Sequence, residues 1–81
     1  MNDDNISVFI NTLTELAREN HLDFSYKYDL KSRFVHLCFK TKGKASIGRV
    51  IITEEEILDS AFPAIYARTV FRQMLRQREQ G

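Results

Sequence analysis

The residue types best suited to chemistry in this chain are its single cysteine, Cys38, and the histidine two residues before it, His36. Residues i and i+2 of a strand share a face, so the two side chains could approach each other. Cysteine catalysis also needs an orienting group and oxyanion donors in a cleft, and the sequence offers no such set. A lone cysteine between Leu37 and Phe39 is more typical of a small packed hydrophobe. We therefore expect no enzyme activity and no catalytic residue.

Metal and cofactor sites are not indicated either. His21, His36 and Cys38 are too few for a closed zinc site. The consecutive acids Glu54–Glu56 splay about 100° apart on a helix, so they do not converge on one ion. Thr53 and Glu56 match a capping box, which explains acids at a helix start. We expect no metal ligand and no cofactor.

Basic residues gather in the middle of the chain. Residues 24–52 carry seven Lys and Arg against one Asp, although the net charge of the whole chain is only +1. Such segregation suits an electrostatic partner. The partner-binding surface that we predict comprises Phe34, His36, Lys40, Lys42, Lys44 and Arg49. A second basic row, with i, i+4 spacing on the last helix, comprises Arg68, Arg72 and Arg76.

Two helices are indicated by apolar residues that recur at helical spacing. The first helix is expected to run to about Asn20, capped by Asp3, Asp4 or Asn5. Its apolar stripe is Ile6, Phe9, Ile10, Leu13, Leu16 and Ala17. The last helix should start near Pro63 and run to about Gln77, with Tyr66 at the edge of its buried side. The residues that it should bury are Ala67, Val70, Phe71 and Met74.

Alternating residues indicate strands between these helices. In residues 23–29, one face carries Phe24, Tyr26 and Tyr28. In residues 33–40, the core face carries Val35, Leu37 and Phe39, and the other carries Phe34, His36, Cys38 and Lys40. Residues 45–52 form a third strand whose facing stays open. Either Ile47, Arg49 and Ile51 or Gly48, Val50 and Ile52 face the core, because a slip of one residue exchanges the two sets.

The resulting order is α-β-β-β-α, with a short extra helix before the last one. We predict one two-layer α+β domain over residues 1–81, in which a three-stranded antiparallel meander is packed by an N-terminal and a C-terminal helix. Its ends, at about residues 1–3 and 78–81, should fray. One cysteine, no long apolar run and an acidic start favour a cytoplasmic protein without a membrane partner.

The segments "LTELARENHLDFSYKYD" and "HLCFKTKGKASIGRV", in this element order, resemble the double-stranded RNA-binding domain over roughly residues 13–50. The resemblance implies a similar topology. That family opens its last helix with a lysine-rich phosphate clamp, where this chain has "TEEEILD". Acids there would repel a phosphate backbone, so RNA binding is not carried over.

In size and build, the whole chain also resembles small proteins of phages and mobile elements of bacteria. Some of these proteins block host defence nucleases or bind other host proteins. The resemblance implies a phage or prophage accessory or inhibitor protein that acts sterically and electrostatically on a host protein. We therefore predict a non-enzymatic protein-binding module whose partner is a host or phage protein. Nucleic-acid binding through the same basic residues is the alternative, and homodimerisation through a sheet edge or an exposed face stays open.

Overall fold

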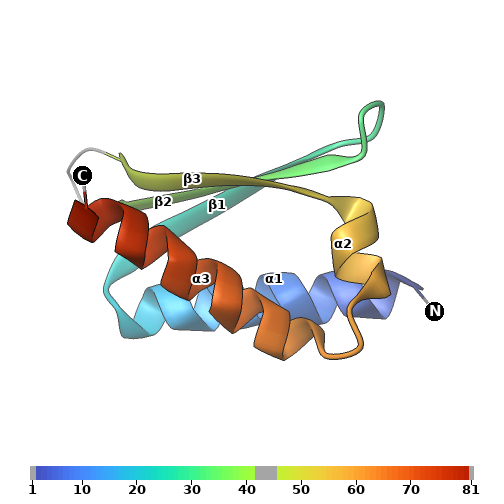
Figure 1. Ribbon diagram of the computed structural model, residues 1–81, viewed down its shortest axis with the longest axis horizontal. Coiled ribbons are helices and arrows are strands. Elements are labelled where there is room, and N and C mark those ends of the chain that lie inside the picture. The colour runs from blue at the N-terminus through green and yellow to red at the C-terminus, as the bar shows by residue number, and fades with distance from the viewer. Residues whose placement is uncertain (1, 42–45, 81) are drawn as a thin grey trace.

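Two long helices cover one face of an antiparallel sheet in the computed structural model, which describes residues 2–41 and 46–80, with side chains for residues 4–41 and 48–76. The elements are α1 (Asn2–Glu19), β1 (Leu22–Asp29), β2 (Phe34–Thr41), β3 (Ser46–Thr53), α2 (Glu54–Asp59) and α3 (Pro63–Gln80). The described strands form one sheet in the order β1-β2-β3. The predicted two-layer α+β fold is confirmed: α1 and α3 lie side by side under the sheet, and α2 closes one end (Figure 1).

Helix α1 buries the predicted apolar stripe, with Phe9, Leu13 and Ala17 fully inside the core. The expected capping by Asp3, Asp4 or Asn5 is wrong, because α1 already begins at Asn2. Asn5 instead donates from Nδ2 to the carbonyl of Leu58, 3.2 Å away, and so ties α1 to α2. The helix ends where His21 takes a left-handed backbone with φ of 58°, a conformation that stops helices.

The turn between β1 and β2 is organised by Asp29. Its Oδ1 accepts hydrogen bonds from the backbone N–H groups of Lys31 (3.0 Å) and Ser32 (3.4 Å). The turn closes where the N–H of Arg33, at φ 60°, donates to the carbonyl of Asp29 (2.8 Å). The Lys31 N–H, helped by Ser32, holds the pKa of Asp29 below its usual value, because hydrogen bonds to a carboxylate favour its ionised form.

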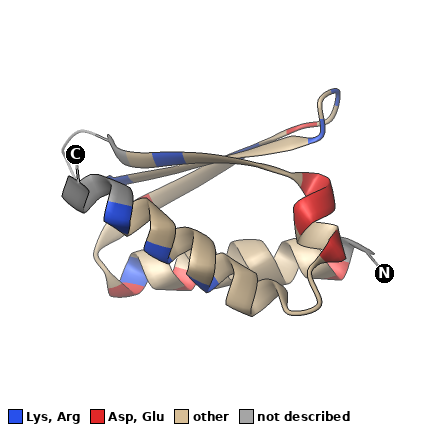
Figure 2. Ribbon diagram, in the orientation of Figure 1, with Lys and Arg blue, Asp and Glu red and all other residues tan. Residues whose placement is uncertain are grey.

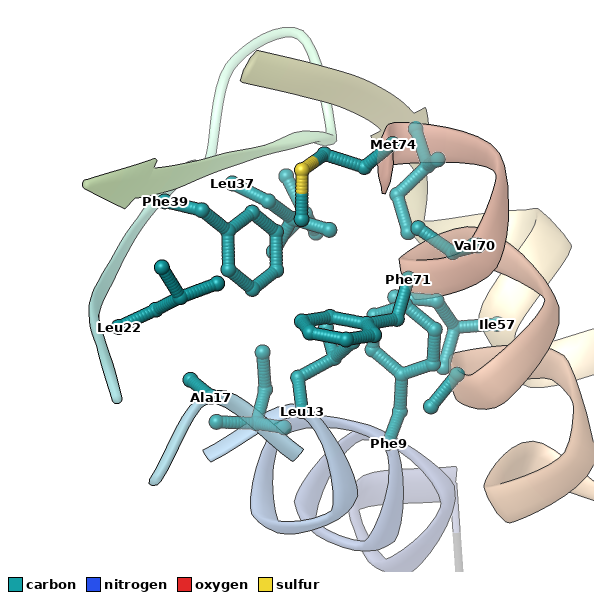
Figure 3. Packing of buried hydrophobic residues seen from close by; sticks show 14 residues of the cluster. Phe9, Leu13, Ala17, Leu22, Leu37, Phe39, Ile57, Val70, Phe71 and Met74 are labelled. Carbon is teal, nitrogen blue, oxygen red and sulfur yellow. The ribbon is translucent and has the colours of Figure 1, made fainter. Parts of the chain in front are cut away.

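The facing of β3 is settled by its register with β2. Gly48, Val50 and Ile52 lie opposite Phe39, Leu37 and Val35, respectively, and therefore share the inner face. Gly48 leaves room for α3, since a Cβ atom there would lie 2.5 Å from Met74 Cγ. Figure 3 shows Met74 reaching from α3 toward Leu37 and Phe39. The buried side chains of this core are Phe9, Ile10, Leu13, Ala17, Leu22, Val35, Leu37, Phe39, Ile52, Ile57, Ala67, Val70, Phe71 and Met74.

Helices α2 and α3 begin as their sequences predict. Thr53 Oγ1 accepts a hydrogen bond from the N–H of Glu56 (3.2 Å), and α3 starts at Pro63. Glu56 Oε2 accepts from Tyr66 Oη (3.0 Å), which links the two helices. Burial, together with this hydrogen bond, raises the pKa of Tyr66 to about 12. Within the described ranges, none of the helices is sufficiently long and apolar to cross a bilayer.

Candidate partner-binding surface

The face of the sheet turned away from α1 and α3 is the candidate functional surface, and we call it the outer face. Directly opposite residues of paired antiparallel strands share a face, so the register defines its members. They are Asp23, Ser25, Lys27 and Asp29 on β1, Phe34, His36, Cys38 and Lys40 on β2, and Arg49, Ile51 and Thr53 on β3.

Phe34, His36 and Ile51 form a cluster of two apolar side chains and one imidazole on the outer face. Ile51 lies opposite His36 and diagonal to Phe34, so the three side chains adjoin across β2 and β3. Ile51 is 60% exposed and Phe34 is 40% exposed. The cluster has a fixed backbone beneath it because β2, the middle strand, is paired on both sides.

Three basic groups lie on the same face. Lys27 lies opposite His36 from β1, while Arg49 lies opposite Cys38 from β3. Lys40, toward the other end of β2, lies opposite Asp23, and the side chains of all three basic residues are exposed. Asp29 lies opposite Phe34, so the positive charge is on the part of the face that adjoins His36 and Cys38.

A shallow depression of about 280 Å³ lies on the outer face beside Lys27, His36, Cys38, Arg49 and Ile51. Ligand pockets usually enclose about 300–1,000 Å³ and bury most of their ligand. This hollow is partly open and lies near the lower end of that range, so a side chain of a docked macromolecule can enter it.

The structure brings four of the six predicted surface residues together. Phe34, His36, Lys40 and Arg49 all lie on the outer face, while Lys42 and Lys44 fall outside the described residues. The second predicted set of basic residues lies on a different element. Arg68, Arg72 and Arg76 lie exposed on α3, in the helical layer, where Figure 2 shows basic positions along that helix.

Sequence reasoning missed Ile51, the most exposed apolar side chain of the outer face. The sequence alone leaves the facing of β3 open, and Ile51 fits the core as well as the surface. The glycine at position 48 was the available signal, because a residue without a side chain marks a place where another element approaches closely.

Nucleophilic chemistry has little support at Cys38 and His36. Cys38 is partly buried, with Ser25 and Arg49 as its cross-strand neighbours. Asp29, the acid nearest His36 along the register, already accepts the turn's hydrogen bonds. Among the described residues, no group of three or more His, Cys, Asp or Glu is placed to hold a metal ion.

Acidic residues gather on helix α2, at one end of the molecule. Helix α2 carries Glu54, Glu55, Glu56 and Asp59, and Figure 2 shows this helix as a red patch at one end of the molecule. The Arg33 guanidinium approaches Glu54 Oε2 at 3.7 Å, and the N–H of Glu54 donates to the carbonyl of Arg33 at 2.9 Å. The end of the hairpin is thereby attached to α2.

Comparisons of this chain with protein-family models, with curated proteins and with solved structures found no similar family, protein or structure.

Proposed function

We propose that this chain is a non-enzymatic binding module whose outer face docks another protein. The observation that carries the proposal is the exposure of Ile51 and Phe34 on a face that α1 and α3 leave open. Aromatic and aliphatic side chains that adjoin on an uncovered surface are typical of the centre of an interface, and charged residues are typical of its rim.

The charges near the cluster indicate which kind of partner surface would be complementary to it. Lys27, Lys40 and Arg49 favour a protein surface on which carboxylates flank an apolar side chain. Apolar contact would supply most of the affinity, and the basic rim would supply orientation and rate of association.

The most concrete form of the proposal is a phage or prophage accessory protein that inhibits a host protein by covering its surface. Its support is the resemblance of the chain, in size and build, to small proteins of phages and mobile elements. An inhibitor of this kind needs no catalytic group, and a rigid sheet with an exposed apolar centre is sufficient for steric blocking.

The test compares two matched substitutions. Ile51→Asp places a charge in the centre of the outer face, while Val8→Asp places one at a 41% exposed position of α1. A host protein recovered from nuclease-treated lysate and then purified should bind the wild-type chain and Val8→Asp equally, and Ile51→Asp at least about tenfold more weakly. Equal binding of both variants would overturn the assignment to the outer face.

Nucleic-acid binding is the second candidate, because Lys27, Lys40 and Arg49 interleave with Phe34 and His36 on one face. Basic groups bind phosphates and exposed rings stack on bases. Titration of DNA and RNA at low and moderate salt separates the two candidates. A complex at low salt that weakens steeply with added salt favours nucleic acid, and no complex at low salt eliminates it.

A further inference from the structure

Strand β1 forms an uninterrupted edge of the sheet. Its pairing with β2 runs from Leu22↔Thr41 to Asp29↔Phe34 without a shift, and within the described residues its other side has no strand partner. An edge strand of this kind can pair with a further strand through its backbone. The opposite edge differs, since the β2–β3 register shifts between Phe39 and Lys40, and irregularities of this kind blunt an edge against pairing.

The side chains of β1 are arranged symmetrically about Ser25. Asp23 and Lys27 lie two residues to either side of it on the outer face, and both are exposed. Phe24 and Tyr26 lie one residue to either side on the inner face, with ring centroids 6.0 Å apart. Tyr26 is 55% exposed, because it lies on an edge strand.

From this symmetry, we propose that two copies of the chain associate by antiparallel pairing of their β1 strands, with a two-fold axis at Ser25. Asp23 of each copy then lies opposite Lys27 of the other, so the interface contains two opposite-charge pairs. Phe24 of each copy lies opposite Tyr26 of the other, which covers the exposed ring of Tyr26.

The charge pattern favours this register over two-fold axes at Tyr26 and Lys27, and an axis at Phe24 would form no Asp–Lys pair because it places Asp23 opposite Ser25. A two-fold axis at Tyr26 would place Asp23 opposite Asp29 of the other copy, and an axis at Lys27 would place the two Lys27 side chains against each other. Like charges directly opposite on paired strands are destabilising. An axis at Ser25 avoids both conflicts. Inner-face residues of one copy then lie opposite inner-face residues of the other, on the same side of the joined sheet.

The dimer joins the two three-stranded sheets into one continuous sheet. Its two-fold axis is perpendicular to the sheet, so both outer faces point the same way, and α1 and α3 of both copies lie on the opposite side. Self-association of this kind does not depend on what the outer face binds. Ile51→Asp on β3 should therefore leave the dimer intact even where it abolishes partner binding.

A charge-swap series tests the proposal by sedimentation across a concentration range. The wild-type chain should sediment as a dimer, while Lys27→Asp and Asp23→Lys should each dissociate at least about tenfold more readily, because each creates two like-charge pairs. An equimolar mixture of the two variants should recover the dimer, since every pair is then of opposite charge. The double variant D23K/K27D should recover it as well. Arg72→Glu, on α3, is the charge-changing control and should behave as the wild type.

Cross-linking tests the position of the axis. Ser25 lies opposite Cys38 within the chain, so the experiment uses the background Cys38→Ala. Under mild oxidation, S25C/C38A should form a covalent dimer, because opposite residues at the axis are within disulfide reach. T69C/C38A, with its exposed cysteine on α3, should not. A monomeric wild-type chain at every concentration, or a dimer indifferent to the charge series and to S25C, would overturn the proposal.

Discussion

The two faces of β2 differ sharply in exposure. Val35, Leu37 and Phe39 point toward α1 and α3 and are at most 1% exposed. Phe34, His36 and Lys40 alternate with them on the same strand and face solvent. One backbone therefore supports both the centre of the core and the centre of the candidate surface.

The difference separates two physical reasons for an apolar residue at a given position of the strand. On the inner face, an apolar side chain is explained by the residues of the same chain that it contacts: Phe39 lies against Phe24 and Phe71, with ring centroids 4.9 and 5.4 Å away. On the outer face, no described element of the chain lies above Phe34 and Ile51. Substitutions that act on folding should therefore be separable from substitutions that act on binding.

The largest expected effect contrasts two phenylalanines of β2. Phe39→Ala should lower the free energy of unfolding by about 3–5 kcal/mol, through lost burial and the cavity that it leaves. Phe34→Ala should lower it by about 1 kcal/mol or less, because the residue is already 40% exposed and lies on the face turned away from α1 and α3. Urea denaturation followed by circular dichroism measures both. Similar losses in the two variants would contradict the separation of the faces.

Gly48 and Arg49 sharpen the contrast on β3. Gly48→Ala should cost about 1–3 kcal/mol, because the added methyl group overlaps Met74 Cγ and Sδ and forces α3 or the Met74 side chain to move. Arg49→Ala, one residue further on and facing outward, should change the free energy of unfolding by about 0.5 kcal/mol or less. In G48A/M74A the added cost of the Gly48 substitution should largely disappear, which a double-mutant cycle would measure.

The sequence was informative wherever one side of an element was clearly apolar. The stripe of α1 and the alternation of Val35, Leu37 and Phe39 correctly predicted which side is buried. Local patterns alone can do this, because helix and strand periods bring such residues to one side. The short α2 is predicted from a different local pattern, the capping box of Thr53 and Glu56, and Thr53 is its N-cap.

Features that depend on distant contacts could not be predicted in this way. Strand β3 offers isoleucines on both faces, and what fixes its facing is the approach of Met74 to Gly48, which are 26 positions apart in sequence. Tyr26 alternates as a core residue would, yet it remains exposed because β1 is an edge strand. The sequence therefore indicates only part of the candidate surface, and the predicted set omits Ile51.

Thr53 is an outer-face residue with a structural role. Its substitution therefore shows that a residue of the outer face can also contribute to the free energy of unfolding. Its Oγ1 accepts the N–H of Glu56 at the start of α2. Thr53→Ala should therefore lower the free energy of unfolding by about 1 kcal/mol. Ile51→Ala, two residues earlier on the same face, should have a smaller effect on unfolding and a larger one on partner binding. Thr53→Ser, which keeps the hydroxyl, should restore most of the lost stability in thermal unfolding.

Asp29, at the opposite edge of the outer face, should show its structural role through pH. Because the turn's hydrogen bonds hold its pKa below the unfolded value of about 3.9, Asp29 stabilises the fold above that value, and the contribution is lost as pH falls through the lower folded pKa. In the unfolded chain the carboxylate takes up its proton first, so acid favours unfolding. Asp29→Asn should flatten the decline in melting temperature below about pH 4. An equal slope in the wild type and in Asp29→Asn would show that the turn is held by its backbone alone.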